Sequence, residues 1–315
     1  MEDIIKTKGR KGAMGHIACF AAYAIFGVNI ITCKDLTAGE LISPLGIFSM
    51  RALGAGSIFW LLSLLLPSAR KEKLALRDLP MILLASFLGF FITQMTFLMA
   101  IPQVTPMTCS IISALSPVYT MFIAAVAIRE PVTLKKAGGV AVSLAGVIFL
   151  IVNSVHGGGA SESTAWGIAL LFVNGLSFSL YLGIFKPLIS RYSVITFMKW
   201  IFLFAALMSL PFSARELVSL EWTSIPALSY LELGFLIIFA TFISYFLIPV
   251  GQKILRPTLV SMYSYVQPII ATLISIFIGM DTLSWQKIVS AALVFTGVVI
   301  VSRSKSAETS ELLKK

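Results

Sequence analysis

The sequence predicts an all-α membrane protein with ten transmembrane helices, arranged as two inverted five-helix repeats. Of its 315 residues, 58% are hydrophobic and 12% are charged, whereas a soluble domain carries about 25% charged residues. The chain contains ten apolar stretches of about 20 residues, the length that crosses a bilayer as a helix, and the second five repeat the first five. We expect the spans at 14–33, 44–66, 80–100, 105–127, 134–152, 165–185, 194–211, 227–248, 257–279 and 284–302.

The repeat is clearest from Pro106 to Ile151, where each copy has an apolar segment broken by proline, an acidic turn and a second apolar segment. A shift of 151 residues aligns Pro106 with Pro257, Ser110 with Ser261, Ser113 with Ser264, Pro117 with Pro268, Glu130 with Asp281, Lys136 with Lys287 and Gly146 with Gly297. The opening spans align at a shift of 152 residues, with Gly15 on Gly167, Phe20 on Phe172, Phe26 on Phe178 and Lys34 on Lys186. Self-similarity of this kind determines the architecture more strongly than any single motif.

The number of spans in each copy decides how the copies are oriented. Because five is odd, the second copy enters the membrane from the opposite face, which makes the repeats inverted. Inverted repeats are typical of secondary transporters, whose substrate site lies near the middle of the membrane at the interface between the repeats. We expect the first repeat at 14–152 and the second at 165–302, joined by a linker at 153–164.

The net charge of +10 follows the predicted topology rather than a nucleic-acid site. With the tails 1–13 and 303–315 both inside, most Lys and Arg residues lie in the inner loops, and the outer loops hold only Lys34 and Arg215. This is the positive-inside pattern, so we expect cytoplasmic termini, a lipid-bilayer environment and no nucleic-acid partner. The basic start resembles a signal peptide, but the repeat requires the first apolar helix as a retained span.

Two basic residues lie within predicted spans at comparable places in the two copies: Arg51 follows Met50, and Lys199 follows Met198. A charge inside the bilayer costs about 3 kcal/mol on insertion scales, so it usually faces a cavity or a partner. If both residues face the interior, they favour substrates with a carboxylate or a phosphate. Alternatively, both lie close enough to a helix start for their long side chains to reach the headgroups. The sequence leaves both interpretations open.

Proline in the fourth and ninth spans predicts bent helices that line a cavity. Pro117 and Pro268 each remove a backbone donor and free a carbonyl, which lipid tolerates only where a neighbour or water satisfies it. A plain structural kink is the alternative. Polar side chains on spans one, three, four, six, eight and nine would complete the cavity. Together with Arg51 and Lys199, the candidate substrate-binding residues are Asn29, Gln94, Ser113, Asn174, Tyr181, Tyr245, Tyr263 and Gln267.

No catalytic residue, metal site or cofactor is predicted. The three cysteines fall within spans, without the spacing of metal ligands. His16 and His156 are the two histidines, and neither pairs with a serine or a carboxylate in a recognisable motif. The run His156–Gly159 matches the oxyanion-hole motif of some esterases, but the nucleophile elbow that should accompany it is missing. This run is therefore interpreted as part of the linker.

The last span of each copy differs in character from the others. Spans 134–152 and 284–302 are rich in Gly, Ala and Ser, which allow close helix contact. We assign them to packing, at the periphery of the bundle or in a homodimer interface. Glu130 and Asp281 precede them in turns with a hydroxyl residue suited to a helix N-cap. We interpret these acids as turn and capping groups rather than proton carriers.

The order of these features resembles the EamA domain, which defines a branch of the drug/metabolite transporter (DMT) superfamily. The resemblance covers about residues 14–302. It rests on the proline-bent helix, Arg129–Thr133 and Gly146–Val147, and on their repetition as Pro268, Asp281–Ser284 and Gly297–Val298, with further similarity at Lys34, Arg51 and Lys186. Met280 and Asp281 depart from the glycine and glutamate that are usual in the family.

The resemblance implies cytoplasmic termini and alternating access around a cavity lined mainly by helices one, three, four, six, eight and nine. Members of the family export amino acids, other small metabolites or toxic compounds. We therefore expect a secondary transporter that exports an amino acid or a related amphipathic compound across the cell (inner) membrane. The alternatives are exchange of nucleotide sugars or sugar phosphates, a membrane-embedded enzyme, and a sensory or structural membrane protein that does not transport.

Overall fold

The structure is a computed structural model, and it describes residues 2–38, 42–104, 109, 112–113, 115–153, 164–220, 222–277 and 285–304. Within these ranges the regular structure is helical and includes no strand. Most of the predicted linker 153–164 and of the tail 303–315 fall outside the described residues, as does the turn at Asp281.

In the first half of the chain, each predicted span corresponds to one helix or to several in direct succession. The elements are α1 (Glu2–Ala38), α2 (Pro44–Leu65), α3 (Pro67–Lys71), η1 (Leu76–Asp78), α4 (Leu79–Ser86), η2 (Phe87–Ile92), α5 (Thr93–Ala100), η3 (Ile101–Gln103), α7 (Ser116–Ala127) and α8 (Leu134–Asn153). Ser43 caps α2 by accepting a hydrogen bond from the backbone N–H of Gly46 at 3.0 Å, the ordinary use of serine at a helix start.

The second half follows the same order of long helices, although its short helices differ. They are α9 (Ala165–Ile184), α10 (Lys186–Arg191), α11 (Val194–Ser219), η4 (Trp222–Ser224), α12 (Ala227–Phe235), η5 (Leu236–Ile243), α13 (Ser244–Ile254), α14 (Pro257–Met262), η6 (Tyr263–Tyr265), α15 (Val266–Phe277) and α16 (Trp285–Ser302). Thr164 caps α9 and Ser193 caps α11, each through its side-chain oxygen.

Among the described residues, six helical stretches are long and apolar enough to cross a membrane. They are Gly12–Thr37, Pro44–Leu65, Leu76–Gln103, Ala165–Ile184, Val194–Arg215 and Ala227–Ile254. These correspond to the first three predicted spans of each repeat, and α7, α8, α15 and α16 lie at the positions of the other four. The chain is therefore a helical, multi-pass membrane protein, and the count of ten spans stays a prediction.

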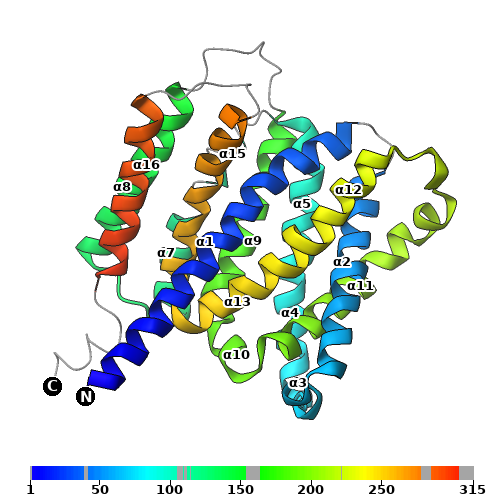
Figure 1. Ribbon diagram of the computed structural model, residues 1–315, viewed down its shortest axis with the longest axis horizontal. Helices are drawn as coiled ribbons and strands as arrows, with labels where there is room; N and C mark the ends of the chain where they lie inside the picture. The colour runs from blue at the N-terminus through cyan, green and yellow to red at the C-terminus, as the bar shows by residue number, and fades with distance from the viewer. Residues whose placement is uncertain are drawn as a thin grey trace.

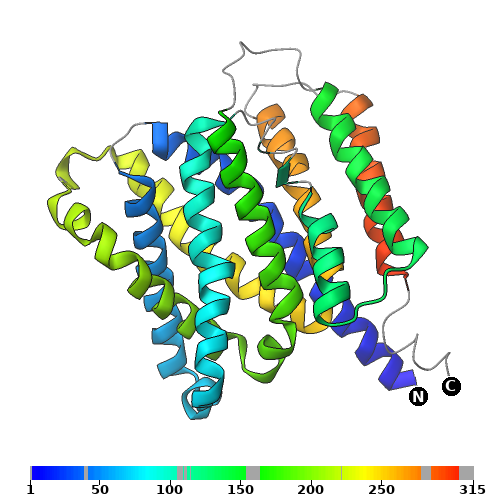
Figure 2. The ribbon, with the colours of Figure 1, turned by 180° about the vertical axis from the view of Figure 1, so that it is seen from behind.

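Helix contacts come in corresponding pairs. α1 packs on α13 and α15, and its counterpart α9 packs on α5 and α7; Figure 2 shows α5, α9 and α7 side by side. α2 contacts η5 as α11 contacts η2, while α2 also packs on α11 and α8 on α16. Each contact of the first kind therefore has an equivalent in the other half of the chain. The contacts between α2 and α11 and between α8 and α16 each join two equivalent helices.

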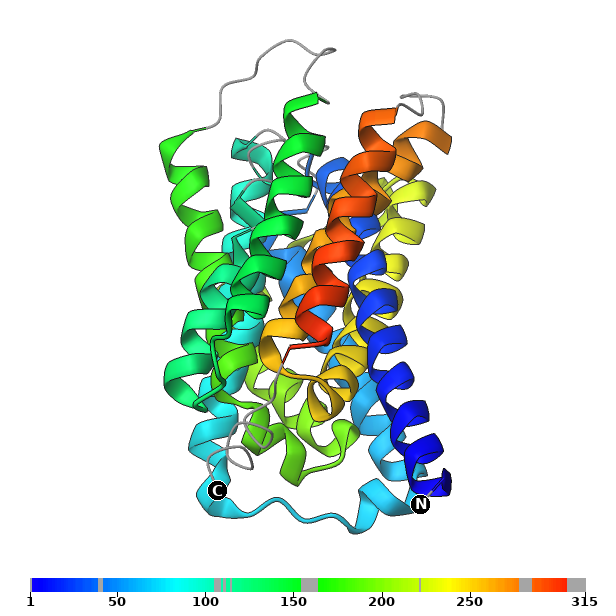
Figure 3. The same cartoon turned by 90° about the vertical axis from the view of Figure 1, so that its left-hand side faces the viewer.

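The helix directions define two ends of the bundle. In Figure 1, α1 rises from the N-terminus at the bottom, whereas α9 descends from the top. α16 finishes at the end of the bundle where α1 begins, as Figure 3 also shows. We call this the termini end, and we call the opposite end, where α8 finishes and α9 begins, the linker end.

The third long helical stretch of each half contains a π-helical segment at the same place. η2 lies between α4 and α5, and η5 lies between α12 and α13. Thr93 Oγ1 donates to the Leu88 carbonyl at 2.7 Å, and Ser244 Oγ donates to the Phe239 carbonyl at 2.9 Å. Each hydroxyl therefore satisfies a carbonyl five residues earlier in the widened helix. π-helical segments are frequent at functional sites.

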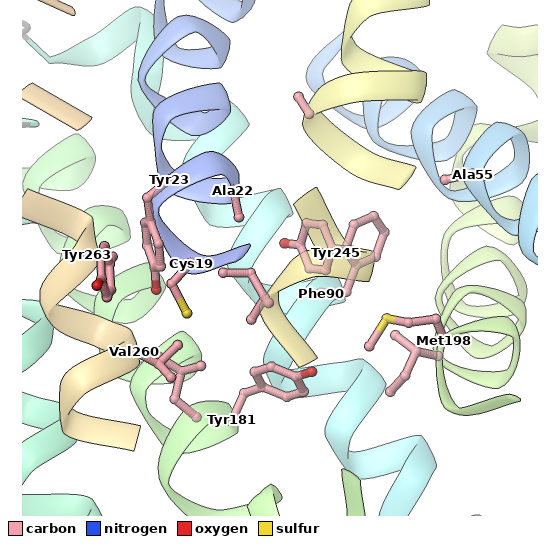
Figure 4. Packing of buried hydrophobic residues seen from close by; sticks show 14 of the residues in the cluster. Cys19, Ala22, Tyr23, Ala55, Phe90, Tyr181, Met198, Tyr245, Val260 and Tyr263 are labelled. Carbon is pink, nitrogen blue, oxygen red and sulfur yellow. The ribbon is translucent and has the colours of Figure 1, made fainter. Parts of the chain in front are cut away.

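One large apolar cluster fills the middle of the bundle and joins both halves. Figure 4 shows Tyr245 of α13 lying against Phe90 of η2. The ring centroids of Phe90 and Tyr245 are 4.9 Å apart in an edge-to-face arrangement, and Phe90 makes a similar contact with Phe202 of α11 at 4.6 Å. Such pairs stabilise beyond the area that they bury.

Candidate functional site

A pocket in the middle of the bundle is lined by residues of both halves. Its lining side chains are neutral polar groups and aromatic rings, with one aliphatic residue, and none of them carries a charge. They are Tyr23, Phe26, Asn29, Ile30, Thr93, Gln94, Phe97, Ser113, Ser116, Asn174, Phe178, Tyr245, Ser264 and Gln267. A concave site with apolar walls and a few convergent polar groups is the usual form of a small-molecule binding site.

The pocket lies between the two halves of the chain. Much of its lining consists of residues that correspond to one another in the repeat: Phe26 and Phe178, Gln94 and Tyr245, Ser113 and Ser264, and Ser116 and Gln267. Gln94 Nε2 donates to Tyr245 Oη at 2.9 Å, across a separation of 151 residues. This direct bond between corresponding residues joins the two halves at the pocket.

Two interrupted helices carry Ser116 of the lining in the first half and Ser264 and Gln267 in the second. α7 begins at Ser116, directly before Pro117, and it follows a turn at Leu115. The corresponding part of the second half runs through α14, η6 and α15, with Pro268 in the first turn of α15. Proline cannot supply the backbone donor that a continuous helix needs. Both interruptions therefore lie beside the pocket.

The contact between α5 and α9 places the amide of Asn174. Asn174 Nδ2 donates to the Thr93 carbonyl at 2.6 Å. Ser177 Oγ of α9 donates at 2.8 Å to the Leu88 carbonyl, which also accepts from Thr93 Oγ1. The Leu88 carbonyl of η2 therefore joins this π-helical segment to α9. Asn174 lies one helical turn before Ser177 in α9, so the same contact holds its amide at the pocket.

Six of the ten predicted substrate-binding residues line this pocket, and four do not. The lining includes Asn29, Gln94, Ser113, Asn174, Tyr245 and Gln267. The structure places Arg51, Tyr181, Lys199 and Tyr263 elsewhere.

Arg51 is fully buried and ties three elements together. Its Nε donates to Thr241 Oγ1 of η5 at 2.8 Å, its Nη2 to the Ala240 carbonyl at 3.5 Å, and its Nη1 to Cys33 Sγ of α1 at 3.8 Å. In this conformation its guanidinium neither reaches the surface nor lines the pocket. It meets neutral acceptors, one of them a carbonyl of the π-helical segment.

The other three residues make separate contacts. Lys199 Nζ lies 5.0 Å from the ring centroid of Trp60, the geometry of a cation–π interaction. Tyr181 is buried against Gly89, where any side chain would collide with the tyrosine ring. Tyr263 Oη lies 2.6 Å from Nδ1 of His16, which belongs to α1.

Several lining residues are absent from the sequence-based set, and the repeat would have found some of them. The missed residues are Tyr23, Phe26, Ile30, Thr93, Phe97, Ser116, Phe178 and Ser264. Ser264 corresponds to Ser113, and Ser116 corresponds to Gln267. Because Ser113 and Gln267 are predicted to line the cavity, the repeat predicts the same position for their counterparts. Phe97 and Ile30 carry no such signal, because an aromatic or aliphatic residue in a membrane span usually faces lipid or core.

The chain is similar to known transporters along most of its length. Residues 13–152 and 165–303 both match the EamA-like transporter family. An uncharacterized transporter of Archaeoglobus fulgidus is 22% identical over 266 residues, which cover 84% of this chain and 91% of that protein. The uncharacterized transporter YetK of Bacillus subtilis is 22% identical over 302 residues, covering 94% and 88%. The S-adenosylmethionine/S-adenosylhomocysteine transporter of Chlamydia trachomatis serovar L2 is 26% identical over 249 residues, covering 75% and 73%.

The fold is also found in a solved structure. A crystal structure of another protein superposes with a TM-score of 0.71 over 96% of this chain and 99% of that chain, at 17% identity, and a likeness at this identity shows the fold alone. The two family matches cover both halves and confirm the resemblance expected from the sequence. The chain therefore belongs to the EamA-like transporter family of the DMT superfamily, and it is a multi-pass membrane transporter.

Proposed function

We propose that this transporter exports a small amphipathic metabolite, an amino acid or a related compound, across the cell (inner) membrane by alternating access. The observation that carries the proposal is the pocket shared by the two halves, with corresponding residues facing each other across it. In alternating access, one repeat moves against the other around a fixed site. A site lined by corresponding residues of both halves can be opened to one side of the membrane by movement of one half, and to the other side by movement of the other half.

The proposal includes two inverted repeats at 14–152 and 165–302, a linker at 153–164 and short cytoplasmic tails. The opposite directions of α1 and α9 in Figure 1 support the inverted arrangement. The basic inner loops support a cytoplasmic termini end. α8 and α16 pair within the chain, with Ser143 Oγ donating to the Val294 carbonyl at 2.9 Å. A homodimer through the outer faces of these two helices is part of the same proposal.

The chemistry of the lining supports an amphipathic substrate over a phosphorylated one. Aromatic rings provide apolar contact, and amides and hydroxyls provide hydrogen bonds. The described lining holds no Lys or Arg, the residues that usually pair with phosphate, so sugar phosphates and nucleotide sugars rank second. S-adenosylmethionine and S-adenosylhomocysteine both contain an amino-acid group, and a relative is named as their transporter. They are therefore candidate substrates of the first class.

Flux through proteoliposomes tests the proposal. We expect saturable efflux of at least one labelled amino acid or S-adenosyl compound, and none of a labelled sugar phosphate. Ser113→Trp fills the pocket and is expected to abolish this flux at normal expression. Phe122→Trp is the matched control, because the side chain of Phe122 is 60% exposed on the outside of the bundle. Absence of flux for every compound would contradict the proposed substrates. Unchanged flux in a folded Ser113→Trp protein would show that this pocket is not the path.

A further inference from the structure

We infer that the side of the pocket formed by α5 and α9 is a subsite for a protonated amino group of the substrate. This inference rests on the proposed function and adds to it the position and orientation of the ligand. The subsite consists of side-chain oxygens of Thr93, Gln94 and Asn174, with Phe97 and Phe178 beside them, and all five residues line the pocket.

Asn174 presents an acceptor because its donor group is already used. Its Nδ2 donates to the backbone carbonyl of Thr93 at 2.6 Å. A backbone carbonyl can only accept a hydrogen bond, so this contact sets which end of the amide faces α5. The amide oxygen of Asn174 lies at the other end of the group, and it is left to accept a hydrogen bond.

Thr93 and Gln94 also donate hydrogen bonds within the protein and keep oxygen acceptors. The Thr93 hydroxyl donates to the Leu88 carbonyl at 2.7 Å, which leaves its lone pairs as acceptors. Gln94 Nε2 donates to Tyr245 Oη at 2.9 Å. Gln94 is 7% exposed, and among the described residues its buried Oε1 has no hydrogen-bond partner. A buried acceptor without a partner destabilises the empty site, and a ligand that supplies an N–H donor would satisfy it.

The surroundings favour a cation at these oxygens. Phe97 lies one helical turn beyond Thr93, and Phe178 lies one turn beyond Asn174. The face of an aromatic ring attracts an ammonium group. No Lys, Arg or His belongs to the described lining, so no lining charge repels an ammonium. Arg51 does not line the pocket and bonds instead to Thr241 in η5.

Binding of matched ligand pairs to the purified full-length protein tests the subsite. Each pair differs only in the amino group: L-phenylalanine and 3-phenylpropionate, L-methionine and 4-(methylthio)butyrate, L-leucine and 4-methylpentanoate. Isothermal titration calorimetry in detergent should show at least about a tenfold loss of affinity when the amino group is removed, since a hydrogen bond to a charged group contributes about 1.5–3 kcal/mol.

Substitutions locate the effect at the proposed oxygens. Asn174→Leu keeps the size of the side chain but removes the acceptor, and Gln94→Met does the same at the second oxygen without touching the α5–α9 bond. At least one of the two variants should reduce the preference for the amino acid to less than half of its wild-type value. Ser113→Ala, elsewhere in the same lining, should weaken both members of a pair alike.

Three results would overturn the inference: equal affinity within every pair, binding of no amino acid in any pair, or a wild-type preference in both folded variants. Failure of the subsite is distinguishable from failure of the proposed function. The first leaves saturable flux of a substrate without a preference for its amino group, whereas the second leaves no flux at all.

Discussion

At the termini end, the loop between α3 and η1 crosses the bundle and meets the segment between α10 and α11, as Figure 3 shows. Glu72 accepts hydrogen bonds there from the backbone N–H of Ser193 at 2.9 Å and from its hydroxyl at 2.5 Å. Asp78 accepts from Tyr192 Oη at 2.7 Å and pairs with Arg191 Nη1 at 3.2 Å. Both carboxylates belong to the first half, and all of their partners belong to the second.

At the linker end, neutral groups join the halves within the part of the chain that the structure describes. The Thr164 backbone N–H donates to the Gln103 carbonyl at 3.0 Å, and the Thr164 hydroxyl donates to Gln103 Oε1 at 3.2 Å. Hydrogen bonds to a charged group are about twice as strong as neutral ones. From this difference we expect the halves to separate more easily at the linker end than at the termini end.

The largest expected effect is the loss of the buried ion pair at the termini end. Lys136 Nζ lies 2.8 Å from Glu130 Oε1, and both side chains are almost completely buried. Lys136→Met leaves the carboxylate of Glu130 buried without its partner and should lower the free energy of unfolding by about 3–5 kcal/mol. Thermal unfolding in detergent measures the loss. The double variant Lys136→Met/Glu130→Leu should recover most of it, and a single variant as stable as the wild type would contradict the prediction.

A smaller effect is expected when the contact between the halves is weakened directly. Asp78→Asn removes the charged acceptor of Tyr192 and should therefore favour opening of the termini end, whereas the exposed Arg191 contributes little. Cys19 is buried in α1. In a Cys33→Ser/Cys109→Ser background, a thiol reagent should therefore label Cys19 several-fold faster when Asp78 is replaced. An unchanged rate would show that Asp78 does not hold this end closed.

Acid should weaken the same end through Glu72. Partial burial would raise the pKa of Glu72, but hydrogen bonds from Ser193 and Thr196 outweigh it and hold the pKa below its usual value of 4.5. A carboxyl whose pKa is lowered by folding stabilises the fold fully above its unfolded pKa and loses this contribution as the pH falls through its folded pKa. Thermal stability should therefore drop below about pH 4.5. Glu72→Gln should flatten that part of the profile, and an unaltered profile would contradict the assignment.

The smallest effect is expected at the linker end. Gln103→Ala removes two neutral, exposed side-chain hydrogen bonds, one from the Thr164 hydroxyl and one to the Met99 carbonyl, so the free energy of unfolding should fall by only about 0.5–1 kcal/mol. Thermal unfolding of this variant beside Asp78→Asn compares the two ends directly. Equal losses of stability in the two variants would contradict the expected difference between the two ends of the bundle.

Residue type predicted six of the lining residues, and the repeat extends that set. Ser113 and Gln267 are polar residues near a proline, and their counterparts Ser264 and Ser116 belong to the same lining. Arg51 shows the opposite case. A buried arginine suggests a ligand or a headgroup, yet its partners are a threonine hydroxyl, a cysteine and a carbonyl freed by the π-helical segment η5. Hydropathy does not reveal such a segment, so these acceptors could not be foreseen.

The sequence by itself determined the helical membrane class, the duplication and the family, because hydropathy and self-similarity are properties of residue order. Only the tertiary structure decided which polar side chains meet in the pocket. Each residue turns a helix by about 100°, so the extra residue of a π-helical turn rotates every side chain beyond it onto another face. Thr93, Gln94 and Tyr245 follow such segments, and the packing of the two halves against each other brings them together.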